Sequence, residues 1–102
     1  MKLFVVTCLN EYLEDVRNIF RQAAIKVFSV TDVSGFKGNH HRDLLSDWFA
    51  SGGADFNSSM IFSFTDATTA GHAMELIKAY NEKSDSGFPV HAFIMPVEQS
   101  SH

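Results

Sequence analysis

Apolar residues along this chain follow two repeat patterns, one typical of strands and one typical of helices. Residues 3–9 form a dense apolar run that is short enough for a strand buried on both faces. Residues 11–24 then place apolar side chains three and four positions apart, which predicts an amphipathic helix. Asn10 is the expected N-cap of this helix, and Glu11 would put negative charge in its first turn.

A second strand is predicted directly after this helix. Residues 26–34 are rich in β-branched and aromatic side chains, and the run ends at Gly35. From Gly35 to residue 57 the composition changes to glycine, asparagine, histidine, aspartate and serine, which is an unusually long connection. An apolar island inside it, residues 44–49, has the spacing of one or two helical turns. Residues 59–65 predict a third strand.

The last third of the chain predicts a second helix and a final strand. Asp66 and Thr68 are candidate caps for a helix whose apolar positions recur at helical spacing up to Tyr80. Residues 81–87 are polar and predict a turn, residues 90–97 predict the last strand, and residues 99–102 form a tail. The resulting order, β-α-β-β-α-β, predicts one α+β domain over residues 1–102. It is the ferredoxin-like arrangement, in which two helices cover one face of a four-stranded antiparallel sheet.

The strands carry apolar side chains on both faces, although the helices would cover only one. Phe4, Val6 and Cys8 point to one face of the first strand, and Leu3 and Val5 point to the other. The third strand alternates in the same way, with Met60, Phe62 and Phe64 opposite Ile61. An uncovered face of this kind would exceed the apolar patch of a typical monomer, so we expect self-association. The alternative is that the long connection folds back over the open face.

Composition narrows the class of function. The chain has 102 residues, a net charge of −4 and a pI of about 5.6, which does not favour binding to DNA or RNA. The N-terminus lacks the features of a signal peptide, and no apolar run approaches the length of about 20 residues that a membrane helix needs, so a cytoplasmic location is expected. The single cysteine, Cys8, is expected to be a buried reduced thiol. No motif indicates an enzyme.

Several segments resemble the PII superfamily of signalling proteins. Residues 12–17, Tyr-Leu-Glu-Asp-Val-Arg, are similar to the start of the first helix in that family. Residues 30–38, Val-Thr-Asp-Val-Ser-Gly-Phe-Lys-Gly, resemble its second strand and the entry to its T-loop. Residues 96–98, Pro-Val-Glu, resemble its closing segment. With the opening Met-Lys-Leu, the resemblance spans residues 1 to about 99, and the joint spacing of these segments is more specific than any one of them.

The resemblance implies a homotrimer that senses a small molecule in clefts between subunits. The ligand would be an adenine nucleotide or another small anion, and residues 36–57, as the T-loop, would dock on a target such as a membrane transporter. The ligand-binding residues that this implies are Gly35, Lys37, Gly38, Asn39, Gly87 and His91. Residues 82–91 lack the lysine-bearing glycine loop of the nucleotide-binding members, and the chain end lacks their Arg-x-Arg segment. We therefore expect a divergent member with an unidentified ligand.

Two further features of the long connection suggest alternative functions. His40 and His41 are adjacent, and Asp43 and Asp47 follow nearby, so imidazole and carboxylate groups could ligate a transition metal. The alternative function is a metal-responsive or metal-tolerance protein similar to the CutA branch of the same fold, which would use His40, His41 or His91, the last from a neighbouring chain.

An apolar cluster in the same segment has the composition of a protein-binding hot spot. Its members are Leu44, Leu45, Trp48 and Phe49. They could dock on a partner, either as part of the sensor or as a ligand-free adaptor. The alternative is that they pack on the protein's own trimer.

Overall fold

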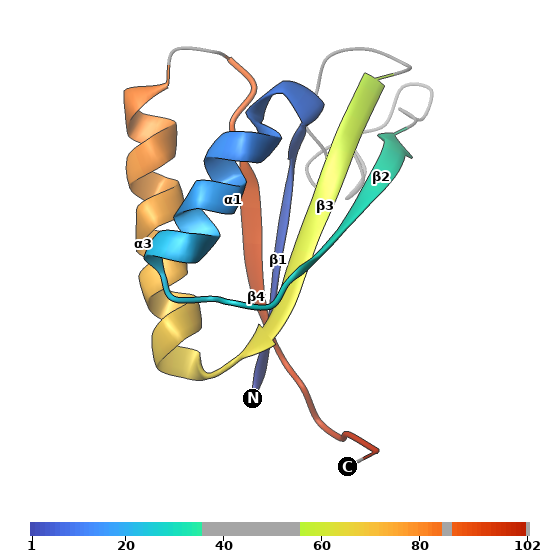
Figure 1. Ribbon diagram of the computed structural model, residues 1–102, viewed down its shortest axis with the longest axis vertical. Helices are drawn as coiled ribbons and strands as arrows, with labels where there is room; N and C mark the ends of the chain where they lie inside the picture. The colour runs from blue at the N-terminus through green and yellow to red at the C-terminus, as the bar shows by residue number, and fades with distance from the viewer. Residues whose placement is uncertain (36–55, 85–86, 102) are drawn as a thin grey trace, which may run out of the picture.

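The protein folds as a βαββαβ unit in which two helices cover one face of a sheet (Figure 1). The computed structural model describes residues 1–35, 56–84 and 87–101. The strands are β1 (Lys2–Leu9), β2 (Ser29–Gly35), β3 (Phe56–Thr65) and β4 (His91–Pro96). The helical elements are the 3-10 helix η1 (Asn10–Tyr12) and the α-helices α1 (Leu13–Gln22) and α3 (Ala67–Lys83). In the described chain, no helix is both long and apolar enough to cross a membrane.

The four strands form one antiparallel sheet in the order β2-β3-β1-β4. β1 lies in the middle and pairs with β3 on one side and β4 on the other. The predicted ferredoxin-like α+β fold is therefore confirmed. Because β2 and β4 are the two edge strands, residues on them are separated by the width of the sheet.

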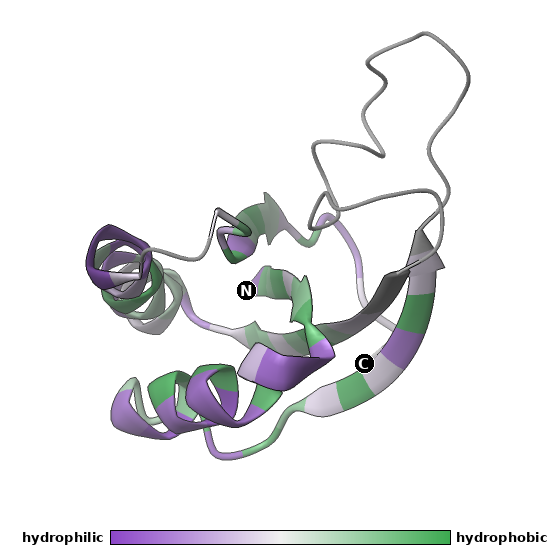
Figure 2. Cartoon of the chain, turned by 90° about the horizontal axis from the view of Figure 1, so that it is seen from above, coloured by the Kyte–Doolittle hydropathy of each residue, from purple (hydrophilic) through white to green (hydrophobic). Residues whose placement is uncertain are grey.

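The hydrophobic core lies between the sheet and the helices. Phe4, Val6 and Cys8 are buried on the helix side of β1, as their alternation predicts. The ring of Phe20, from α1, lies with its centroid 5.5 Å from that of Phe4 and 5.1 Å from that of Phe28. These aromatic contacts fix α1 against the sheet, and seen from above both helices lie on the same side of it (Figure 2).

The N-terminal end of the first helix differs from the prediction. Asn10 does not cap a helix that begins at residue 11; instead it starts η1, and α1 begins only at Leu13. The side chain of Asn10 is engaged elsewhere, because its Oδ1 accepts a hydrogen bond from the Oγ of Ser59 on β3. A long-range partner therefore takes the oxygen that would otherwise cap the helix.

The second strand begins three residues later than predicted, at Ser29. α1 ends at Gln22, and Ala24 adopts a positive φ of 66°, which turns the chain back toward the sheet. Residues 26–28 belong to this return segment. The carbonyl oxygen of Val27 accepts a hydrogen bond of 2.7 Å from the Oγ of Ser63, so Val27 is held by a side chain rather than by strand pairing.

The remaining boundaries shift by a few residues. β3 starts at Phe56 rather than at residue 59, and β4 covers His91–Pro96 rather than 90–97. Of the two candidate caps for α3, Asp66 is the N-cap. Its Oδ1 accepts a hydrogen bond of 2.7 Å from the backbone N–H of Thr69. Thr68 lies inside the helix. The helix also continues through residue 83, so Asn81 is helical and not part of the predicted turn.

Candidate interaction surface

The face of the sheet that points away from α1 and α3 is predominantly apolar. Strand register defines its rows, because residues that pair across antiparallel strands share a face. Leu3 lies between Phe64 and Met95, and Val5 lies between Phe62 and Phe93. We call this surface the open face; its central apolar members are Leu3, Val5, Met60, Phe62, Phe64, Phe93 and Met95.

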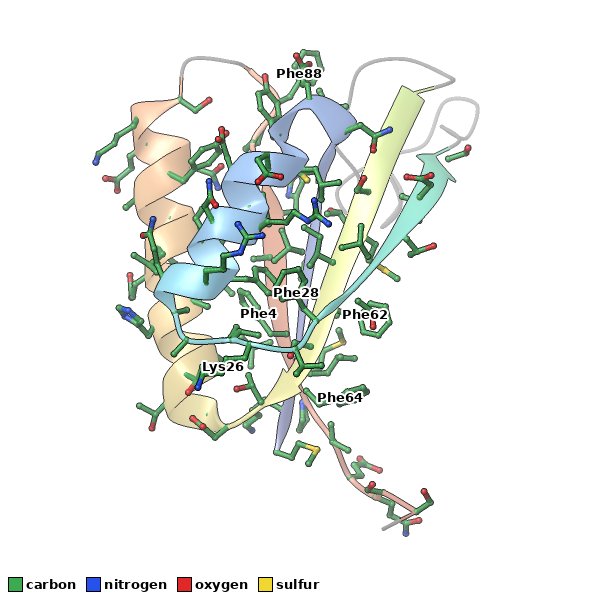
Figure 3. All side chains as sticks on the ribbon, viewed as in Figure 1. Phe4, Lys26, Phe28, Phe62, Phe64 and Phe88 are labelled. Carbon is green, nitrogen blue, oxygen red and sulfur yellow. The ribbon has the colours of Figure 1, made fainter. Side chains whose placement is uncertain are left out.

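The open face is only partly shielded from solvent. The side chain of Phe64 is 58% exposed, whereas Val5, at the centre of the sheet, is buried. Phe62 and Phe64 project from β3 on the side opposite the helices, while Phe4 and Phe28 lie among the core side chains (Figure 3). A shallow groove with wholly apolar walls runs across this face; it is lined by Leu3, Val5, Met60, Phe62, Phe64 and Met95. Such a surface suits contact with another apolar surface.

One row of the open face is more polar. Thr7 pairs with Met60 on one side and with His91 on the other. The next residue on this face of β3 is Ser58, which is fully buried, and its Oγ has no hydrogen-bond partner in the described structure. Thr7 and Ser58 were not singled out from the sequence, because a hydroxyl residue within a strand gives no signal of its burial. Ser58 in turn lies between Leu9 and Val33, so polar and apolar side chains are mixed toward the end of the sheet where β2 finishes.

Two side chains of the described core, Cys8 and Tyr80, have raised pKa values that favour their protonated forms. Burial raises the pKa of the Cys8 thiol from 9.0 to about 11, which keeps it protonated at neutral pH. The pKa of the Tyr80 hydroxyl is raised to about 12 by partial burial and by its hydrogen bond of 2.8 Å to the Oδ2 of Asp15. Cys8 is therefore the buried thiol expected from the sequence, and Tyr80 ties α3 to α1.

Three of the six predicted ligand-binding residues lie in the described chain. Gly35 is the last residue of β2, and His91 is the first residue of β4, next to Thr7 on the open face. Gly87 is exposed in the connection between α3 and β4 and has a φ of 77°, a conformation that favours glycine. Because β2 and β4 are opposite edges, Gly35 and His91 are separated by three strand spacings, roughly 14 Å, across the sheet, and Gly35 is also offset along the strands because it pairs with Phe56, four residues before the Met60 row of His91. One chain therefore does not bring them into one site.

The other predicted site residues lie outside the described residues. They are the ligand-binding candidates Lys37, Gly38 and Asn39, the metal candidates His40 and His41, and the docking candidates Leu44, Leu45, Trp48 and Phe49. The predicted helical turns at residues 44–49 fall in the same segment. Within the described ranges, no group of three histidine, cysteine or acidic side chains is placed to hold a metal ion.

A second apolar feature was not recognised in the sequence. A groove at the edge of the sheet is lined by Val27, Phe28, Ser29, Phe62, Ser63 and Phe64, and we call it the edge groove. Val27 is 82% exposed there. The sequence did not predict this groove, because residues 26–28 were expected to belong to the second strand. The edge groove shares Phe62 and Phe64 with the open face, so the two apolar surfaces are continuous.

The position of His91 is fixed by a side chain from α3. The Nδ2 of Asn81 donates a hydrogen bond of 2.8 Å to the carbonyl oxygen of Val90, and the backbone N–H of Val90 donates one of 2.9 Å to the Oδ1 of Asn81. This pair of bonds holds the chain immediately before β4.

No protein-family model matches the chain, and no curated protein matches it.

Proposed function

We propose that this chain is a PII-like regulatory protein that works as a homotrimer and senses a small anionic metabolite or an adenine nucleotide. The observation that carries the proposal is the open face. It places Phe62, Phe64 and Leu3 on a sheet surface that no helix of the described chain covers. A domain that associates through this face would bury the same kind of side chains on both sides of its sheet.

The free energy of this association comes from apolar burial. Each Å² of apolar surface removed from water contributes about 25 cal/mol, and complete burial of a phenylalanine side chain contributes about 1.5–3 kcal/mol. Phe64 is more than half exposed in the single chain, and Phe62, Phe93 and Met95 are each partly exposed. Several such side chains per copy supply enough free energy to offset the entropy cost of bringing copies together, which is about 4–15 kcal/mol.

The topology supports a ligand site between copies rather than within one. Gly35 ends one edge strand and His91 begins the other. In the proposed ring of copies, the β2 edge of one copy would face the β4 edge of the next. Residues 35–39 of one copy and Gly87 and His91 of its neighbour would then form the two walls of a cleft.

The segment between β2 and β3 would transmit the signal. Ligand binding at its base would favour one of two states of residues 36–57, and the affinity for a target would change through the difference in binding to those states. The target would be a protein such as a membrane transporter, contacted by the apolar cluster of residues 44–49. This part of the proposal rests on the resemblance and on the length of the segment.

The proposal is tested by combining a binding screen with a measurement of mass. Calorimetry with AMP, ADP, ATP, cyclic nucleotides and bicarbonate should identify at least one ligand. Its affinity should fall about tenfold in His91→Ala and should not change in His72→Ala, a matched change of an exposed histidine on α3. Light scattering should give the mass of a trimer. If none of these anions binds, the sensor function is wrong; if the protein is a monomer at every concentration, the intersubunit site is wrong.

A further inference from the structure

The edge groove lies where the pairing between β2 and β3 stops. Pairing begins at Ser29, opposite Phe62, and each step backward along β2 corresponds to one step forward along β3. Continuing this register by two residues would add two further pairs. The residues that line the groove are the last observed pair and these two further pairs, namely Ser29 with Phe62, Phe28 with Ser63 and Val27 with Phe64. The edge groove is therefore an opening between two segments of one chain whose register already matches.

The side chains of the return segment are placed in accordance with an extension of β2. Successive residues of a strand face opposite sides of the sheet, so the extension would put Phe28 on the helix side and Val27 on the open face. The ring of Phe28 already packs on the helix side, with its centroid 5.1 Å from that of Phe20 (Figure 3). Val27 lines the edge groove together with Phe64, a member of the open face.

A side-chain hydrogen bond holds the return segment in its observed position. The Oγ of Ser63, which is buried, donates to the carbonyl oxygen of Val27 at 2.7 Å. In a strand ladder, the backbone groups of the two segments would bond to each other instead. The observed position thus gives the Ser63 hydroxyl a partner but leaves the side chain of Val27 82% exposed.

The upstream end of the return segment is fixed, which limits the extension to two residues. The backbone N–H of Ile25 donates to the carbonyl oxygen of Phe20 at 2.9 Å, and the side chain of Ile25 is buried in the core. Between Ile25 and the first paired residue, Ser29, valine and phenylalanine have strong strand propensity. Local propensity therefore favours strand pairing here, and the bond from Ser63 opposes it.

We propose that residues 27–28 switch between two positions: in a single copy Ser63 holds the edge groove open, and association of copies closes it by pairing these residues with β3. The inference rests on the self-association proposed above and deepens it. In the closed position Val27 would lie beside Phe64 and enlarge the apolar surface of the open face. A second copy that covers both side chains would bind the closed position better and so increase its population.

Ser63→Ala tests the switch through the sign of its effect. Sedimentation would measure the dissociation constant of the assembly, which should fall about two- to tenfold, the factor that one hydrogen bond contributes to an equilibrium constant. The constant falls because the apparent affinity rises with the population of the closed position. If Ser63 only stabilised the fold, its loss would leave the constant unchanged or raise it. Ser34→Ala, at an exposed serine of β2, is the matched control and should have no effect.

Hydrogen exchange on the wild-type protein gives a second measurement that needs no variant. Two added pairs direct one backbone N–H of residues 27–28 into the ladder, so exchange in this segment should slow at least tenfold on assembly. If the protein assembles but this exchange does not slow, or Ser63→Ala does not lower the dissociation constant, the switch is wrong and association through the open face stands. A wild-type protein that does not assemble at all would overturn both.

Discussion

At the scale of single residues, burial controls the ionisation of Cys8. Its folded pKa of about 11 exceeds the value of 9.0 for an exposed thiol. Below pH 9 the thiol is protonated in both the folded and the unfolded state. The stability that the protein gains from burying the neutral thiol is therefore fully present there. Between pH 9 and 11 the unfolded state alone ionises, and the free energy of unfolding should fall by roughly 1–3 kcal/mol.

Urea denaturation at several pH values across this window would measure that loss. Cys8→Ala is the comparison, because it removes the thiol and keeps Tyr80, whose raised pKa of about 12 reduces stability at higher pH. The variant will be less stable at every pH, but its free energy of unfolding should decline less between pH 9 and 11. Parallel curves for the two proteins would contradict a buried, protonated thiol.

Individual residues also show what the sequence can and cannot predict. The alternation of Phe4, Val6 and Cys8 against Leu3 and Val5 correctly assigned the two faces of β1. Alternation works because a strand directs successive side chains to opposite faces. The prediction that Asn10 caps the first helix was wrong. Its hydrogen-bond partner Ser59 lies 49 positions away, and no local pattern indicates such a pair.

At the scale of elements, the junction between α3 and β4 depends on Asn81. Both its amide nitrogen and its amide oxygen bond to Val90, which is buried. Asn81→Ala would leave a buried N–H and a buried C=O unsatisfied, so the free energy of unfolding should fall by about 1–3 kcal/mol. Urea denaturation would measure the change. Asn18→Ala, on the exposed surface of α1, is the control and should cost less than about 0.5 kcal/mol. Equal losses in the two variants would show that the bonds to Val90 do not stabilise this junction.

The elements themselves were predicted more accurately than their ends. Seven-residue and longer patterns identified the four strands and the two α-helices of the described chain in their correct order. The start of β2 was misplaced because residues 26–28 have strand-forming side chains, whereas the positive φ of Ala24 and the bond from Ser63 to Val27 remove them from the sheet. The strand propensity of a residue is a local property, but the position at which a strand ends depends on its pairing with the neighbouring strand.

At the scale of the whole molecule, the sequence predicted an apolar face, and the resemblance implied a ligand site between subunits without stating which edges of the sheet its residues occupy. The order of elements alone does not state that Gly35 and His91 lie on opposite edges. That separation follows from β1 and β3 occupying the middle of the sheet. Gly35 and His91 could therefore share a ligand only in a cleft between two copies, as the proposed function requires.

Association through the open face, as proposed, would make thermal stability depend on protein concentration. A partner that binds only the folded state raises its melting temperature by mass action, so the Tm of the wild-type protein should increase with concentration. Phe64→Glu should abolish this increase, because it replaces a large apolar contact with a charge that assembly would bury. Phe64 is 58% exposed in the single chain, so the fold of the monomer should persist.

The matched control is Val30→Glu, which introduces the same charge on the other face of the sheet at a side chain that is 38% exposed. This variant should keep the concentration dependence. Complete burial of a phenylalanine is worth about 1.5–3 kcal/mol, so the loss in Phe64→Glu corresponds to at least a tenfold weaker assembly. A wild-type Tm that does not change with concentration, or a Phe64→Glu variant that keeps the wild-type slope, would show that copies do not meet through the open face. The regulatory function proposed for the clefts between them would then lose its structural basis.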